Sequence, residues 1–178
     1  MSLLIPGCDL VIPDYNCNTC EIPELGVVRG LALVKKDYVF TDPSNATEWT
    51  TAITDGNVLV VPETAGSMDS SPLYGKGYGG QKQRLIGDEY TLNAIAGNYK
   101  ANCGFWNTVK FANIFKLAFV TESLVHVTDV PVSISPKAPI QDDSNTEVAW
   151  NIEFTWTSRY SACPFDKPAG IFDCFTEG

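Results

Sequence analysis

Two cysteines, Cys17 and Cys20, have the spacing of a metal-binding or redox pair. A structural zinc site needs four ligands, and a strong zinc signal contains two such close pairs. The chain has six cysteines but one close pair, so the other ligands would have to come from both ends of the chain. A zinc-stabilised domain and a redox pair remain open alternatives, but we expect buried or incidental thiols and no cofactor. Because no positively charged, long apolar secretion signal precedes these cysteines, reduced thiols are favoured over disulfides.

Other residues that could do chemistry lack the setting that catalysis requires. The one histidine, His126, lies between two valines in a predicted strand, with no nucleophile presented on a tight turn. Adjacent carboxylates in a polar loop make a poor glycosidase pair without a cleft around them. The glycine-rich residues 75–80 lack the Gly-Lys-Ser/Thr ending of a phosphate-binding loop. We therefore expect a protein that is not an enzyme.

Two polar loops hold the side chains that we expect to make contacts between subunits. A basic cluster lies in or beside the loop predicted over residues 62–83, and an acidic group lies in the loop over residues 136–146. Solvated turns would have the same composition, but loops of this length in a compact domain are usually functional or mobile. The candidate contact residues are Lys76, Tyr78, Lys82, Arg84, Asp142, Asp143 and Asn145.

Composition excludes several classes of protein. The chain has 178 residues, of which 44% are hydrophobic, enough to bury a core. It carries 12 Lys and Arg against 21 Asp and Glu, a net charge of -9. Proteins that grip nucleic-acid phosphates are basic, so this class is disfavoured, whereas an acidic wall past which DNA slides is allowed. No apolar run approaches the roughly 18–20 residues of a membrane helix.

The first half of the chain predicts an arm, a strand, a helix, a second strand and a long loop. Residues 1–26 contain three prolines and no sustained hydrophobic period, which predicts an extended arm. A strand is expected over residues 27–39 and another over 58–61. Between them, Asp42 as N-cap and Pro43 as first residue predict a helix over 43–54, with Trp49 and Ile53 on one face and Gly56 at its end. Residues 62–83 are rich in glycine, serine and proline, which predicts a loop.

The second half predicts strands around one helix. Residues 85–95 favour a strand, and Asn102 precedes a helix expected over 103–113. Residues 115–127 alternate apolar with other side chains, as a strand does. Residues 130–134 alternate too, with Pro131 outward, which indicates an edge or a bend. The clearest strand, near residues 148–156, alternates apolar and polar side chains, as a half-buried antiparallel strand does. Its apolar members, expected in the core, are Val148, Trp150, Ile152, Phe154 and Trp156.

These elements predict an α+β, mainly β fold. We expect an antiparallel β-sandwich or half-barrel with one or two flanking helices and long loops. The predicted organisation is an extended arm over residues 1–26, a β domain over 27–160 and an irregular tail over 161–178.

The order of elements in the second half resembles that of bacteriophage tail-tube-type proteins. A strand near residues 85–95 is followed by a helix at 103–113, a strand pair, and a hairpin whose acidic loop, residues 136–146, precedes the strand at 147–156. Such proteins pair a β-sandwich or barrel with a helix and project a long hairpin loop towards neighbouring subunits. The Asn-, Asp- and Thr-rich composition is similar to that of virion proteins from crAss-like phages of gut Bacteroidota, whose ring proteins stack below the portal.

The resemblance implies a tail-tube-like or portal-proximal ring subunit that lines a channel for DNA. It implies a closed homo-oligomer of about six to twelve copies, with heterologous contacts between copies and with the portal or other tail rings. The protein would be part of the virion tail, assembled in the cytoplasm of the host bacterium, with no membrane contact. A carbohydrate-binding or adhesive β-sandwich, with Trp106 and Tyr78 as an exposed platform, is the alternative in another functional class.

Overall fold

The computed structural model describes residues 3–4, 11–12, 26–62, 64–76, 83–140 and 147–173. The architecture is mainly β, with 47% of the described residues in strands and 12% in two helices, which confirms the predicted fold class. Strands β1 (Leu3–Leu4) and β2 (Val11–Ile12) pair antiparallel with each other. Neither helix of the described residues is long and apolar enough to cross a membrane.

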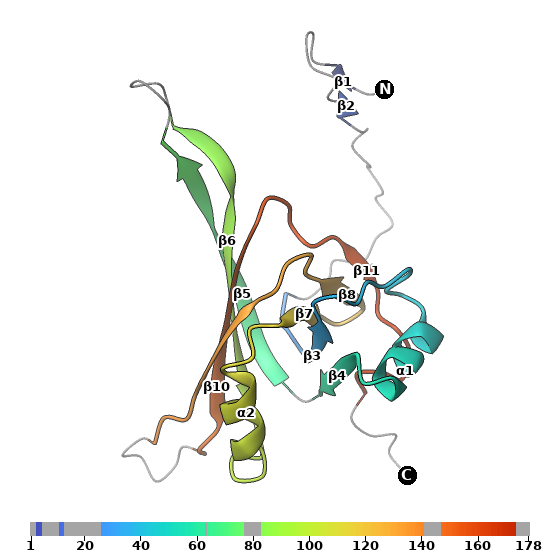
Figure 1. Cartoon of the computed structure of the whole chain (residues 1–178), viewed down its shortest axis with the longest axis vertical. Coiled ribbons are helices and arrows are strands. Elements are labelled where there is room, and N and C mark those ends of the chain that lie inside the picture. The colour runs from blue at the N-terminus through green and yellow to red at the C-terminus, as the bar shows by residue number, and fades with distance from the viewer. Residues whose placement is uncertain are drawn as a thin grey trace.

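One sheet has four strands in the order β5-β6-β10-β9, and every neighbouring pair is antiparallel. Its first two strands form a long hairpin that extends well beyond the body of the molecule (Figure 1). The strands are β5 (Thr64–Gly75), β6 (Arg84–Ala96), β9 (Ser133–Lys137) and β10 (Trp150–Ser158).

A second antiparallel sheet has five strands in the order β11-β8-β7-β3-β4. An isolated bridge between Val28 and Gly66, with N···O distances of 3.0 and 3.1 Å, joins the chain just before β3 to β5 of the first sheet. The strands are β3 (Gly30–Lys35), β4 (Val58–Val61), β7 (Phe115–Val120), β8 (Leu124–Val127) and β11 (Pro164–Asp166).

Two apolar cores hold three layers together. The larger core lies between the sheets, where side chains such as Leu33, Leu92 and Phe154 are buried and α2 (Cys103–Val109) contributes Trp106. The smaller core lies on the other face of the five-stranded sheet, which α1 (Ala46–Thr54) and the C-terminal Phe172 cover. Because β7 and β3 are buried on both faces, their sequences lack a polar alternation.

The first helix begins later than the sequence predicted. Asn45 is the N-cap, and its side chain accepts a hydrogen bond from the Thr47 N–H at 3.0 Å. The expected cap, Asp42, instead accepts hydrogen bonds from the N–H and hydroxyl of Ser44, so the chain makes a turn before the helix starts. The end is as predicted, with Gly56 in the left-handed region at φ +68°. The predicted pairing of Trp49 with Ile53 was wrong, because Ile53 is exposed and the buried neighbour is Ala52.

The predicted loop over residues 62–83 was the largest error. Residues 64–75 form the 12-residue strand β5, paired throughout with β6. Strand β5 is at the edge of its sheet, so the missing backbone N–H of Pro72 removes no hydrogen bond to a further strand. Both of its faces are polar over much of its length, so no period-two apolar pattern marks the strand in the sequence.

The later elements agree better with prediction. Strand β10 buries Trp150, Ile152, Phe154 and Trp156 on one face, as expected, but Val148 lies before the strand and is half-buried, so its place in the core was wrong. Strand β9 is an edge strand, as the proline before it indicated. The second helix ends at Val109 instead of residue 113, and Asn102 precedes it without making a side-chain capping bond. Part of the predicted irregular tail is ordered, since it contains β11 and buries Phe172.

Candidate functional site

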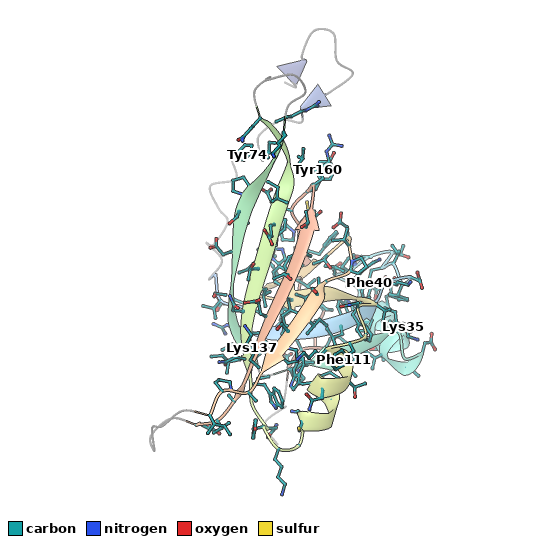
Figure 2. All side chains as sticks on the ribbon, turned by 60° about the vertical axis from the view of Figure 1, so that its left-hand side comes forward. Lys35, Phe40, Tyr74, Phe111, Lys137 and Tyr160 are labelled. Atoms are coloured by element: carbon teal, nitrogen blue, oxygen red, sulfur yellow. The ribbon has the colours of Figure 1, made fainter. Side chains whose placement is uncertain are left out.

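The outer face of the four-stranded sheet, seen obliquely in Figure 2, is mainly polar apart from Ala65 and the exposed Ile95. In antiparallel strands, directly opposed residues share a face, so the registers define rows across the sheet. These rows point away from the buried residues of β6 and β10. They are Ala65–Ile95–Asn151–Lys137, Ser67–Asn93–Glu153–Ser135, Asp69–Thr91–Thr155–Ser133 and Ser71–Glu89–Thr157.

The charge on this face is acidic and sparse. Among the residues of those rows, Lys137 is the one basic side chain, against Asp69, Glu89 and Glu153. The rest are mainly serine, threonine and asparagine, which form hydrogen bonds without binding phosphates tightly. Part of the face is hollowed into an open groove of about 570 Å³, with Lys137 and Glu153 in its lining. The face can therefore contact a polyanion weakly but offers no cationic clamp.

The far end of the β5–β6 hairpin exposes apolar side chains. Tyr74, Leu85 and Ile86 are 56%, 56% and 57% exposed, and Figure 2 shows Tyr74 at that end of the molecule. A register shift between Leu73 and Tyr74 leaves Ile86 without an opposite residue, which is the pattern of a β-bulge. Beyond this bulge Tyr74 pairs with Leu85. An exposed apolar strand pair is typical of a contact surface.

The structure describes two of the seven predicted contact residues. Lys76 and Arg84 are both exposed, at the two sides of the hairpin end. The other five, Tyr78, Lys82, Asp142, Asp143 and Asn145, lie outside the described residues, as do Cys17 and Cys20.

The sequence reasoning missed the three apolar residues of the hairpin end. Tyr74 lies in the predicted loop over residues 62–83, whereas Leu85 and Ile86 lie at the start of the predicted strand over 85–95, and no local pattern marks that end as exposed. The outer face of β5 was missed for the same reason.

Of the groups with possible chemistry, His126 makes structural contacts. His126 stacks on Phe119, with ring centroids 4.8 Å apart, and its Nδ1 lies 3.1 Å from the Ala162 carbonyl oxygen. Cys103 and Cys163 are free and exposed. Within the described parts of the chain, no three His, Cys, Asp or Glu side chains are grouped as metal ligands would be. Trp106 is 1% exposed, which contradicts its predicted place on an exposed sugar-binding platform.

Among the residues that the structure describes, two titratable groups have a shifted pKa, and both lie near α1. Burial raises the pKa of the Tyr38 hydroxyl, and the nearby charges of Glu48 and Asp55 add to the effect. Hydrogen bonds from the Ser44 hydroxyl and N–H lower the pKa of Asp42. Both shifts follow from the local fold of this helix start and lie away from the four-stranded sheet.

Comparison with known proteins identifies no relative: no family model, no curated protein and no solved structure matches this chain.

Proposed function

We propose that this chain is a structural protein of a bacteriophage virion, a subunit of a homo-oligomeric ring in the tail or at the portal–tail junction. In this proposal the outer face of the four-stranded sheet lines a channel for DNA. The protein is not an enzyme and takes no cofactor. Its partners are further copies of itself and the neighbouring portal or tail rings, with DNA in transient passage.

The observation that carries the proposal is the chemistry of that outer face. A channel wall must be wetted by water and must not hold the phosphate backbone. Rows made mainly of serine, threonine and asparagine, with three acids, one lysine and the two apolar residues Ala65 and Ile95, meet both requirements. An ordinary solvated sheet face is polar as well, but surface lysines usually accompany its acids. Of the 12 Lys and Arg in the chain, Lys137 is the one in these rows.

The topology of the sheet supports a ring. Four strands that alternate in direction place β5 and β9 at the two edges, running in opposite directions. Copies related by rotation about an axis roughly parallel to the strands would bring β5 of one copy beside β9 of the next. These strands would then be antiparallel, like every other pair in the sheet. A sheet extended in this way around an axis has no free edge.

Prolines limit where such pairing occurs. Pro72 and Pro136 lie in the two edge strands and cannot donate backbone hydrogen bonds. The contact would therefore use Ser67 to Ser71 of β5 and Ser133 to Ser135 of β9. A contact this short is weak alone but gains strength when a closed ring repeats it.

The first test is the mass and symmetry of the purified protein, by light scattering and then electron microscopy of the same fraction. Closed rings with a central hole would support the proposal and give the copy number. Protein that stays monomeric at every concentration, alone and with tail or portal rings, would refute it.

A charge variant tests the edges themselves. Ser67→Glu with Ser135→Glu adds like charges on both sides of the proposed contact and should dissociate the rings at low salt. Thr50→Glu with Thr54→Glu adds the same charge on exposed positions of α1, away from both edges, and should leave the rings intact. Equal behaviour of the two variants would argue against contacts through β5 and β9.

A further inference from the structure

One edge of the five-stranded sheet has neither a partner nor the usual protection against pairing. Strand β4 is the last strand of that sheet, and among the described strands only β3 pairs with it. An exposed sheet edge can pair with another chain, so natural proteins commonly interrupt it with prolines and charges. The other edges of the two sheets contain both: Asp69 and Pro72 in β5, Pro136 and Lys137 in β9, and Pro164 and Asp166 in β11. Strand β4, Val58–Val61, consists of three valines and a leucine and contains neither.

The backbone of Val60 points towards this free edge. The Lys35 N–H donates to the Asn57 carbonyl oxygen at 2.9 Å, so these two residues are a hydrogen-bonded pair of the antiparallel ladder. Such pairs alternate with pairs that are not bonded to each other, and in the register of β3 and β4 the latter include Val60 opposite Ala32. The N–H and C=O of Val60 are therefore directed outward, and no described residue bonds to them. Val58 has the same orientation but is only 4% exposed, so Val60 is the accessible position.

A pocket of about 380 Å³ runs along the same edge. Its lining includes Val60 and Val61, although successive side chains of a strand point to opposite faces. Val61 packs against the core between the two sheets, and Val60 packs against the core under α1. A pocket that meets both residues therefore borders the edge of the strand. Its opposite wall is the end of β6 and α2, and no charged residue lines it.

An occupant of this edge must be extended and apolar at successive positions. It must be extended because a strand is what bonds to outward N–H and C=O groups of a sheet edge. It must be apolar at successive positions because its side chains point alternately to the two faces, and β4 has an apolar core on each face. Exposed apolar residues such as Phe111 and Val39 lie outside strands, so they cannot supply this backbone.

Strands β1 and β2 meet both requirements. The other nine described strands belong to the two sheets, whereas β1 and β2 pair with each other and lie apart from both sheets (Figure 1). An isolated two-stranded ladder is at best marginally stable in water, so little opposes its opening. Strand β2, Val11–Ile12, is β-branched at both positions, which suits an added strand better than the leucines of β1. Figure 1 shows β2 and β4 on opposite sides of the body, which directs β2 to another copy.

We propose that β2 of one copy adds to the β4 edge of a second copy and exchanges two hydrogen bonds with Val60. One side chain of β2 then enters the pocket, and the next covers the other face of the sheet beside Val60. The donor and acceptor surfaces differ, so the contact is head-to-tail. This contact does not depend on the proposed channel, because it uses neither the outer face of the four-stranded sheet nor the edges β5 and β9.

Hydrogen–deuterium exchange resolved to single amides tests the contact on the full-length protein. The N–H of Val60 exchanges readily in a free edge, whereas the N–H of Leu59 is bonded to β3 and is the internal reference. Raising the protein concentration should slow exchange at Val60 by at least about tenfold, because an added strand keeps that amide bonded in most molecules. Exchange at Leu59 should change by less than about twofold, since its bond lies within one chain.

A pair of variants identifies the occupant. Val11→Asp should abolish the slowing at Val60, because a charge in β2 is costly to bury at an apolar edge. Val39→Asp is the matched control, the same change at a residue that is 74% exposed, and should preserve the slowing.

Three outcomes would overturn the inference. Fast exchange at Val60 at every concentration would mean that the edge stays free, and slow exchange at every concentration would mean that it is closed within one chain. Slowing that survives Val11→Asp would mean that another segment occupies the edge. Rings that form without slowing at Val60 would leave the proposed function standing.

Discussion

Gly66 lies where β5 pairs closely with β6 and also forms the bridge to Val28 beside the second sheet. Replacing Gly66 should destabilise the protein strongly. A Cβ added at this position would collide with the Asn93 carbonyl oxygen and lie 3.1 Å from the Ala94 Cα. Both obstacles are backbone atoms of β6, so no flexible side chain can move aside. The same residue exchanges two hydrogen bonds with Val28. Any shift of β5 that relieves the collision would therefore strain the bridge between the sheets.

Overpacking of this kind costs about 1–3 kcal/mol, and we expect Gly66→Ala to lie at the upper end, about 3 kcal/mol. For a chain of this size, 1 kcal/mol shifts the melting temperature by roughly 2–4 °C, so the variant should melt about 6–12 °C lower. Thermal unfolding followed by circular dichroism measures this shift.

Gly104→Ala is the matched control, because a Cβ at Gly104 meets nothing within 4 Å and the residue lies in α2. That substitution should stabilise the protein by about 0.5–1 kcal/mol, since alanine loses less backbone entropy in a helix than glycine. A Gly66→Ala variant within about 0.5 kcal/mol of the parent, below the usual range for overpacking, would refute the close approach of β5 to β6.

Three further predictions concern the helix cap, the alkaline limit of stability and the channel wall. Asn45→Ala should cost about 1 kcal/mol of unfolding free energy in urea titrations, because the Thr47 N–H loses its acceptor; no change would refute Asn45 as the cap. Tyr38 has a raised pKa, so its contribution to stability is complete below the unfolded value near 10 and is lost as pH rises through the folded value. Tyr38→Phe should therefore reduce the loss of stability as pH rises above about 10, and an unchanged pH profile would contradict the shift. In assembled rings, Thr155→Lys should strengthen the binding of duplex DNA at low salt, and this gain should disappear as the salt concentration rises. Thr50→Lys on α1 should not strengthen binding. Equal binding by the two variants would argue that the outer sheet face does not line the channel.

Much of the secondary structure could be read from local pattern. The alternation of β10 predicted the strand and four of the five residues expected in its core, because one face of that strand is solvated and the other is packed. The left-handed Gly56 marked the end of α1 correctly, since only that backbone conformation turns the chain there. The start of α1 was harder, because Asp42 and Asn45 are both good caps and the Ser44 hydrogen bonds decide between them.

The candidate site was less predictable than the fold. Lys76 and Arg84 were proposed as contact residues from the charge cluster alone, and both are exposed. Tyr74 was not proposed, because the glycine, serine and proline around it indicate a loop. Whether such a segment becomes a strand depends on a partner strand that supplies its hydrogen bonds. That partner, β6, is held in place by β10 on its other side.

The sequence alone determined the fold class, the helix positions to within a few residues, the core face of β10 and the acidic balance of the chain. These properties depend on residues close together in the chain, through the periods of strands and helices and through the sum of charges. Only the tertiary structure decided which polar residues share the outer face of the sheet, how far the hairpin extends, and that β4 lies at the edge of its sheet. Those features depend on strand order and register, which bring together residues as distant as Ser67 and Glu153 through the strand between them. No local pattern encodes them, because each is a property of how the two sheets pair and pack.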